Sequence, residues 1–109
     1  MVVSRPQASE DIIRAVADPT RRGLLDLLAS RDEPVNNLAE KFDMTLPAVS
    51  QHLRVLREVG LVEERRVGRY RFYRLHADPL REIADWVSSY ERFWRKKLRD
   101  LGEHLNRNP

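Results

Sequence analysis

Residues 45–60, TLPAVSQHLRVLREVG, constrain the fold more than any other stretch, because they predict a short amphipathic helix with both ends marked. Thr45 can cap the backbone NH groups of the first turn, Pro47 is tolerated inside that turn, and Gly60 suits the helix exit. At 100° per residue, one side of this helix is apolar and the opposite side is polar. The apolar stripe comprises Val49, Leu53 and Leu56. The polar face comprises Pro47, Ser50, Gln51 and Arg54.

A helix of about 15 residues is about 23 Å long, enough to lay its N-terminal half along a DNA major groove about 12 Å wide. The polar face therefore predicts a recognition helix that contacts DNA through Ser50, Gln51 and Arg54. In an isolated helix such a face would merely be solvated, but the neighbouring elements favour DNA contact. His52 lies at the flank of the apolar stripe, where we expect a packed or hydrogen-bonded histidine.

The segments before this helix predict three more helices. Residues 1–9 are expected to form a flexible arm, and Ser9 is expected to cap the first helix. Asp18 can cap a second helix, about residues 19–30, whose four leucines are expected to place it in the core. After the polar break RDEP, the string VNNLAEKF predicts a helix of two turns, and a short turn then leads into the helix over 45–60. Two short helices joined in this way match a helix-turn-helix unit.

From residue 61 the pattern changes to two strands, LVEERRV and YRFYRL, around a tight turn at Gly68 and Arg69. By alternation, Tyr73 and Leu75 share one face of the second strand. This hairpin predicts the wing of a winged helix-turn-helix. The expected fold class is therefore mainly α with a β-hairpin wing.

Positive charge is concentrated around the predicted wing. Residues 54–75 carry seven arginines against three glutamates, a net charge of +4, whereas residues 1–53 carry −2. We expect the wing arginines to contact DNA phosphates or the minor groove, above all at the tip of the hairpin. The other interpretation is a charged edge strand that discourages aggregation. These arginines are Arg65, Arg66, Arg69 and Arg71.

The last stretch, about residues 79–105, predicts one long helix with an apolar residue at every third or fourth position. Such a helix is about 40 Å long, too long for the small body to cover, so the same helix of a second subunit is the expected partner. Trp86 and Phe93 widen the stripe and are expected to be dimer core rather than a ligand site. The predicted dimer interface comprises Ile12, Ile13, Val16, Leu80, Ile83, Val87, Tyr90, Trp94, Leu98 and Leu101.

The composition excludes several classes of protein. With 109 residues and no cysteine, the chain is expected to form one domain, residues 10–109, without disulfides, thiolate metal sites or a cysteine nucleophile. No apolar run is long enough for a signal peptide or a membrane span, which favours the cytoplasm. The string Ser50-Gln51-His52 lacks a third group and an oxyanion site, so neither enzymatic activity nor a cofactor is expected.

Several strings resemble the ArsR/SmtB family of bacterial and archaeal winged-helix repressors. They are ADPTRRGLLDLL (17–28), LAEKFDMTLPAVSQHLRVLREVGLV (38–62) and GRYRFYRL (68–75). The tail PLREIADWVSSYERFWRKKLRDL (79–101) is similar to members with a tryptophan-containing dimer helix. The combination is specific even though no single string would be. The resemblance implies a symmetric homodimer, held by the first and last helices, that binds a promoter operator and excludes transcription.

The resemblance also assigns roles to residues of the recognition helix. Thr45, Ser50 and Gln51 map onto DNA-contacting positions of the family. Leu46 and Pro47 stand where other members carry more polar side chains. These two residues are expected to make apolar contacts with thymine methyl groups in place of hydrogen bonds. The alternative is that the first turn of the helix contributes less to DNA contact.

The metal sites associated with the family are expected to be absent. Pro34 and Asn36 occupy the two positions of the cysteine pair. The other family site uses histidines well inside the last helix, where this chain has only His104 near the end and His76 and Asp78 before the start.

The prediction is a homodimeric, sequence-specific DNA-binding transcriptional repressor on a palindromic operator, with no metal, cofactor or membrane. Its expected partners are double-stranded DNA and a second copy of the chain. Two other classes stay open: a winged-helix protein-interaction module without specific DNA binding, and an accessory dimerisation domain of an enzyme. The sequence identifies neither a small-molecule effector nor the target genes.

Overall fold

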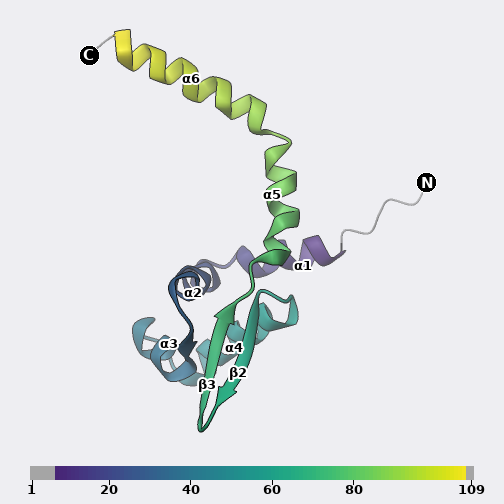
Figure 1. Ribbon diagram of the computed structural model, residues 1–109, viewed down its shortest axis with the longest axis vertical. Coiled ribbons are helices and arrows are strands. Elements are labelled where there is room, and N and C mark those ends of the chain that lie inside the picture. Colours follow the sequence, from purple (N-terminus) through teal and green to yellow (C-terminus); the bar gives the residue numbers. More distant parts are fainter. Residues whose placement is uncertain (1–6, 108–109) are drawn as a thin grey trace, which may run out of the picture.

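The computed structural model describes residues 7–107, and Figure 1 shows a helical body with a β-hairpin below it and two further helices leading away above it. The elements in chain order are α1 (Gln7–Val16), α2 (Pro19–Ser30), β1 (Glu33–Pro34), α3 (Val35–Lys41), α4 (Leu46–Glu58), β2 (Val62–Val67), β3 (Tyr70–Leu75), a 3-10 turn η1 (Asp78–Leu80), α5 (Arg81–Ser88) and α6 (Glu91–Arg107). The mainly α fold with a β-hairpin wing is confirmed.

Two of the predicted capping residues, Asp18 and Thr45, begin their helices as expected. Asp18 Oδ2 accepts a hydrogen bond of 2.9 Å from the Arg21 backbone NH at the start of α2. Thr45 Oγ1 accepts one of 3.3 Å from the Ala48 NH at the start of α4. At the exit of α4, Gly60 has a φ of 81°, a left-handed conformation that closes the helix and turns the chain into β2.

The turn between α3 and α4 fixes the geometry of the helix-turn-helix. Asp43 has a φ of 51°, in the left-handed region that aspartate tolerates better than most residues. The Met44 NH donates to the Ala39 carbonyl at 3.0 Å, and the Asp43 NH donates to the Glu40 carbonyl at 3.2 Å. This pair of hydrogen bonds ends α3 and directs the chain into α4.

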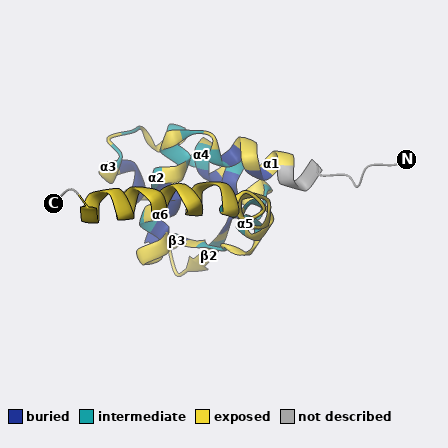
Figure 2. Ribbon diagram, turned by 90° about the horizontal axis from the view of Figure 1, so that it is seen from above, coloured by how far each residue is buried: buried dark blue, intermediate teal, exposed yellow. Residues whose placement is uncertain are grey.

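The core lies between α2, α3, α4 and the inner face of the hairpin, as the buried segments in Figure 2 indicate. The predicted apolar stripe of α4 is completely buried, and so are leucines from α2 and α3. The largest fully buried side chains are Leu24, Leu38, Leu53, Leu56, Leu61, Val49 and Val62. The side of α4 opposite this stripe consequently remains at the surface.

The sheet contains a third strand that the sequence did not predict. β1 pairs with β3, giving the order β1-β3-β2, with Glu33 opposite Tyr73. Glu33 is only 3% exposed and accepts hydrogen bonds from Arg31, Lys41 and Asn37. The hydrogen bond from Arg31, with those from Lys41 and Asn37, outweighs the effect of burial and holds the pKa of Glu33 below its usual value.

Two boundary predictions at the N-terminus were wrong. α1 begins at Gln7, so residues 7–9 belong to a helix rather than to an arm, and Ser9 lies within this helix rather than before it. The rest of the predicted arm, residues 1–6, lies outside the described residues.

The prediction of one continuous helix over residues 79–105 was also wrong. α5 ends at Ser88 and α6 starts at Glu91, with a turn at Ser89 and Tyr90. The Ser88 and Ser89 hydroxyls donate to the carbonyls of Asp85 and Trp86, respectively. They thereby compete with backbone NH groups for the carbonyls of the last turn of α5. α6 consequently leaves the body at a new angle. The radius of gyration is 18.4 Å, against about 13 Å for a compact chain of this length.

Among the described residues, no helix is both long enough and apolar enough to cross a membrane.

Candidate nucleic-acid interface

The outer face of α4 carries the predicted recognition residues at the surface. Gln51 and Arg54 are exposed and Ser50 is half-buried, because each lies away from the buried stripe of the helix. The three residues that open the helix, Thr45, Leu46 and Pro47, are exposed as well. All six positions lie outside the buried core. The six residues therefore form a continuous polar and apolar surface along the N-terminal half of α4.

The first turn of α4 lies beside the wing. A shallow groove of about 170 Å³ separates the two, lined by Pro34, Val35, Asn36, Leu46, Arg69, Tyr70 and Arg71. The structure thus brings the start of the recognition helix, the start of α3 and the end of the hairpin together on one side of the molecule. Groups from three elements can contact one extended ligand there.

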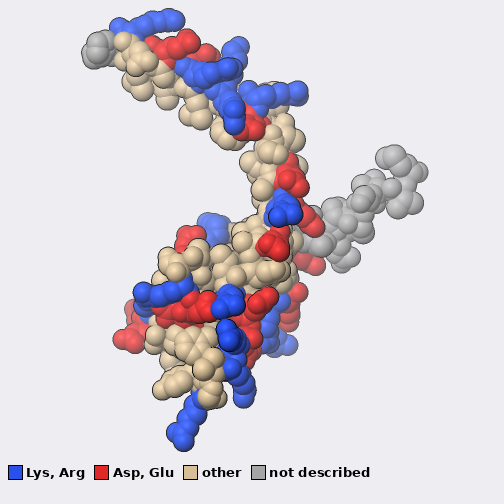
Figure 3. Space-filling model, viewed as in Figure 1, with Lys and Arg blue, Asp and Glu red and all other residues tan. Residues whose placement is uncertain are grey.

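The wing ends in a two-residue turn. Val67 pairs with Tyr70, and Gly68 adopts a φ of 62°, as such hairpin turns require at the first central position. Arg69 is the other turn residue and is exposed at the end of the hairpin. Figure 3 shows positively charged side chains extending from this tip.

The wing arginines differ in their partners. Arg65, Arg66 and Arg69 form no ion pair among the described residues. Arg66 lies directly opposite Arg71 across the two strands, a like-charge arrangement that is unfavourable without an anion nearby. The hairpin is therefore electrostatically suited to an anionic partner.

Two of the predicted contact arginines are already paired on the surface. Arg54 Nε lies 3.3 Å from Glu58 Oε1, and Arg71 Nη1 lies 3.7 Å from Glu64 Oε1. The Arg54 and Glu58 side chains are both about two-thirds exposed. Because exposed ion pairs contribute about 0–1 kcal/mol, Arg54 can exchange its carboxylate for a DNA group at little cost.

Sequence reasoning missed one residue of this surface. Tyr70 is 61% exposed beside the tip, and its ring meets the edge of Phe72 at 6.4 Å between centroids. The alternation in YRFYRL carried a usable signal, since it places Tyr70 and Phe72 on the face opposite Tyr73.

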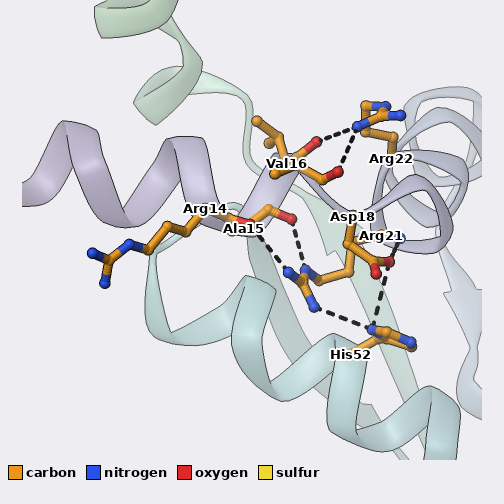
Figure 4. Close-up of polar contacts among 8 residues, drawn as sticks. Arg14, Ala15, Val16, Asp18, Arg21, Arg22 and His52 are labelled. Atoms are coloured by element: carbon orange, nitrogen blue, oxygen red, sulfur yellow. Dashed lines mark hydrogen bonds and ion pairs between the residues drawn. The ribbon is translucent and has the colours of Figure 1, made fainter.

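Arg21 and Arg22 lie in the first turn of α2, where Arg21 is half-buried and Arg22 is exposed. Both donate to backbone carbonyls at the end of α1 (Figure 4). His52 is half-buried and lies 3.4 Å from Arg21, which agrees with the expected hydrogen-bonded role. The contact between Arg21 and His52 supports α4 from behind, away from its outer face.

The predicted dimer residues fall into three groups. Ile12 is 4% exposed and packs inward, so it belongs to the core of its own chain and does not line a surface. Val16, Leu80 and Ile83 are half-buried against that core. On α6 the Lys and Arg side chains lie largely on the side away from the body, and uncharged side chains lie on the side toward it (Figure 3). The remaining predicted residues are exposed. This exposed group comprises Ile13, Val87, Tyr90, Trp94, Leu98 and Leu101.

Within residues 7–107, no three His, Cys, Asp or Glu side chains gather to hold a metal ion. His76 has a structural role, since its Nδ1–H donates to the Gly60 carbonyl at 2.9 Å and its Nε2 lies 3.3 Å from Asp78. The hydrogen bond to Gly60 raises the pKa of His76, and the Asp78 carboxylate adds to the effect. The interaction ties the end of β3 to the exit of α4.

Comparison with known proteins agrees with this geometry. The family description "Bacterial regulatory protein, arsR family" matches residues 18–64, which include α2, α3 and α4. The transcriptional repressor SdpR of Bacillus subtilis is 31% identical over 80 residues, covering 73% of this chain and 89% of SdpR.

Two solved structures are similar over most of the chain. The crystal structure of an ArsR family transcriptional regulator is 30% identical, with a TM-score of 0.74, covering 86% of this chain and 97% of that one. The homodimeric winged helix-turn-helix DNA-binding domain from Mycobacterium bovis is 29% identical, with a TM-score of 0.67, covering 83% and 90%. This chain therefore belongs to the arsR family of bacterial regulatory proteins.

Proposed function

We propose that the protein is a homodimeric, sequence-specific DNA-binding transcriptional repressor that binds a palindromic operator in the cytoplasm. The observation that carries the proposal is the exposed outer face of α4 beside a hairpin whose Arg65, Arg66 and Arg69 have no ion pair within the described part of the chain. A helix of this size enters a major groove, and arginines without carboxylate partners are suited to phosphates. The names of the relatives support a role in transcription.

Ser50, Gln51 and Arg54 read base edges in the major groove. Gln51 suits adenine and Arg54 suits guanine, because each side chain can form two hydrogen bonds with that base. Each such bidentate contact contributes about 1–3 kcal/mol of discrimination.

The first turn of α4 makes a different kind of contact. The Thr45 hydroxyl already accepts the Ala48 NH, so its contribution to DNA binding comes through its remaining hydrogen-bonding capacity. Leu46 is 44% exposed and Pro47 follows it, and both present carbon to the groove. We assign them to thymine methyl groups.

The wing supplies attraction that does not depend on base sequence. Arg69 at the tip contacts phosphates or the minor groove, with Arg65, Arg66 and Arg71 along the strands. Each phosphate contact releases counterions, so binding should weaken steeply as salt is added.

The dimer forms through the terminal helices. The exposed apolar side chains of α1, α5 and α6 lie away from the wing tip, so a partner covering them leaves the DNA surface free (Figure 1). A two-fold axis through such an interface places the two α4 helices in successive major grooves, about 34 Å apart. The homodimeric relative from Mycobacterium bovis supports this arrangement.

The proposal is tested by fluorescence anisotropy of the purified protein with DNA from upstream of its own gene and with a scrambled duplex, at two salt concentrations. We expect preference for the native duplex and weaker binding at the higher salt concentration. Failure to bind either duplex at low salt would contradict the proposal. It would instead favour a protein-interaction module.

A further inference from the structure

One side chain connects three helices, α1, α2 and α4. Arg21, in the first turn of α2, extends its guanidinium between the end of α1 and the back of α4 (Figure 4). Its Nε donates to the Ala15 carbonyl at 2.6 Å, and its Nη2 donates to the Arg14 carbonyl at 3.1 Å. Its Nη1 lies 3.4 Å from Nδ1 of His52 on α4. A single group thus contacts both the α1 end and the recognition helix.

The hydrogen-bonding roles in this junction follow from the chemistry of the groups. A guanidinium only donates, so His52 Nδ1 can take part in this contact only as an acceptor. The carbonyls of Arg14 and Ala15 lie at the C-terminal end of α1, which attracts positive charge, and the Arg14 carbonyl also accepts the Ala17 NH at 3.3 Å. The planar guanidinium of Arg21 therefore forms hydrogen bonds with groups of two helices, α1 and α4.

Asp18 fixes the backbone of Arg21. Its carboxylate caps α2 by accepting the Arg21 backbone NH at 2.9 Å, and the same oxygen lies 3.9 Å from His52 Nδ1. The backbone of Arg21 is thereby fixed relative to the groups that its side chain contacts.

Arg22 provides a natural comparison. Its Nη1 donates to the carbonyls of Val16 at 2.7 Å and Ala17 at 3.0 Å, so it also closes the end of α1. No hydrogen bond or ion pair among the described residues joins Arg22 to α4. The two neighbouring arginines therefore perform the same task at α1, and Arg21 alone adds the connection to the recognition helix.

We propose that Arg21 is a positioning residue that sets the angle of α4 relative to α1, and through it the distance between the two recognition helices of a dimer. This inference rests on the proposed function. α1 carries the exposed Ile13 and the half-buried Val16 of the predicted dimer face, whereas α4 carries the DNA surface. The Arg21 to His52 contact is a direct polar link between the two faces.

A small change in the angle of α4 is enough to alter the spacing between the two recognition helices. α4 has 13 residues and is therefore about 20 Å long. A tilt of about 10° moves one end of such a helix by about 3.5 Å, which is about the rise of one base pair. Loss of the link should therefore change the half-site spacing that the dimer prefers, in addition to its affinity.

The test measures binding of the full chain to a panel of palindromic duplexes whose half-site centres are about 9 to 12 base pairs apart. Arg21→Lys keeps the charge but loses the planar guanidinium, His52→Leu removes the acceptor, and His52→Gln restores an acceptor. Arg22→Lys is the matched control. We expect Arg21→Lys and His52→Leu to bind the preferred duplex about tenfold more weakly and to spread or shift the spacing preference.

His52→Gln and Arg22→Lys should keep the spacing profile of the unaltered protein. Circular dichroism and the mass of each free variant show whether it is folded and dimeric, and the two His52 variants decide the question if Arg21→Lys does not fold. Identical spacing profiles for the unaltered protein and both His52 variants would overturn the inference while leaving the proposed function intact. Absence of binding by the unaltered protein at every spacing would overturn both.

Discussion

The apolar stripe of α6 gives a quantitative prediction for Leu98→Ala. Leu98 is 58% exposed in the single chain, so a partner that covers it removes more than half of the side chain from water. Truncation to alanine deletes three carbons, worth about 2.4 kcal/mol if fully buried at about 0.8 kcal/mol per carbon. Scaled by the exposed fraction, the loss is about 1.4 kcal/mol per subunit. A symmetric dimer contains two copies, so the dimer loses about 2.8 kcal/mol, or roughly a hundredfold in its dissociation constant.

Sedimentation equilibrium of the free protein measures this dissociation constant directly. Leu46→Ala is the matched control, because it makes the same truncation at a leucine that is 44% exposed on the DNA surface. The control should leave dimerisation unchanged and reduce DNA affinity instead. Equal dimer dissociation constants for the unaltered protein and Leu98→Ala would refute the assignment of the α6 stripe to a second copy.

Four further substitutions test other parts of the account. Arg69→Ala should weaken binding to cognate and scrambled DNA alike, whereas Gln51→Ala should cost about 1–3 kcal/mol on cognate DNA only; equal losses on both duplexes for both variants would contradict this division of roles. Gly60→Ala should lower the free energy of unfolding in urea by about 1–2 kcal/mol, because φ is 81° there, and no change would refute the strain argument. The folded-state pKa of Glu33 is depressed, so its stabilising contribution is present above the usual value of 4.5 and is lost as pH falls through the lower folded pKa. Glu33→Gln should therefore flatten the fall in melting temperature between about pH 5 and pH 3; a fall as steep as that of the unaltered protein would count against this role.

The parts of the fold that depend on neighbouring residues could be predicted from the sequence. Asp18 and Thr45 each cap a helix that starts at the next residue, and the stripe of α4 follows from its period alone. Gly60 and Gly68 mark turns whose backbone angles favour glycine. These signals act within a few residues and need no tertiary contact.

The parts that were missed depend on contacts between distant segments or on weak local competition. β1 has two residues and exists only because it pairs with β3, about 40 residues later in the chain. The turn at Ser89 and Tyr90 was missed because the apolar spacing continues through it, although Ser88 and Ser89 can take helix carbonyls. The role of Arg21 required the end of α1 and the back of α4 to be close in space.

Hydroxyl-radical footprinting of the protein on its operator tests the central claim most directly. One dimer with two α4 helices related by a two-fold axis should protect two symmetric segments, centred about one helical turn apart on one face of the duplex. Weaker protection should flank them where the wings contact the backbone, and Arg69→Ala should remove it. A single protected segment, or uniform protection along the duplex, would contradict the proposal that paired recognition helices read a palindrome.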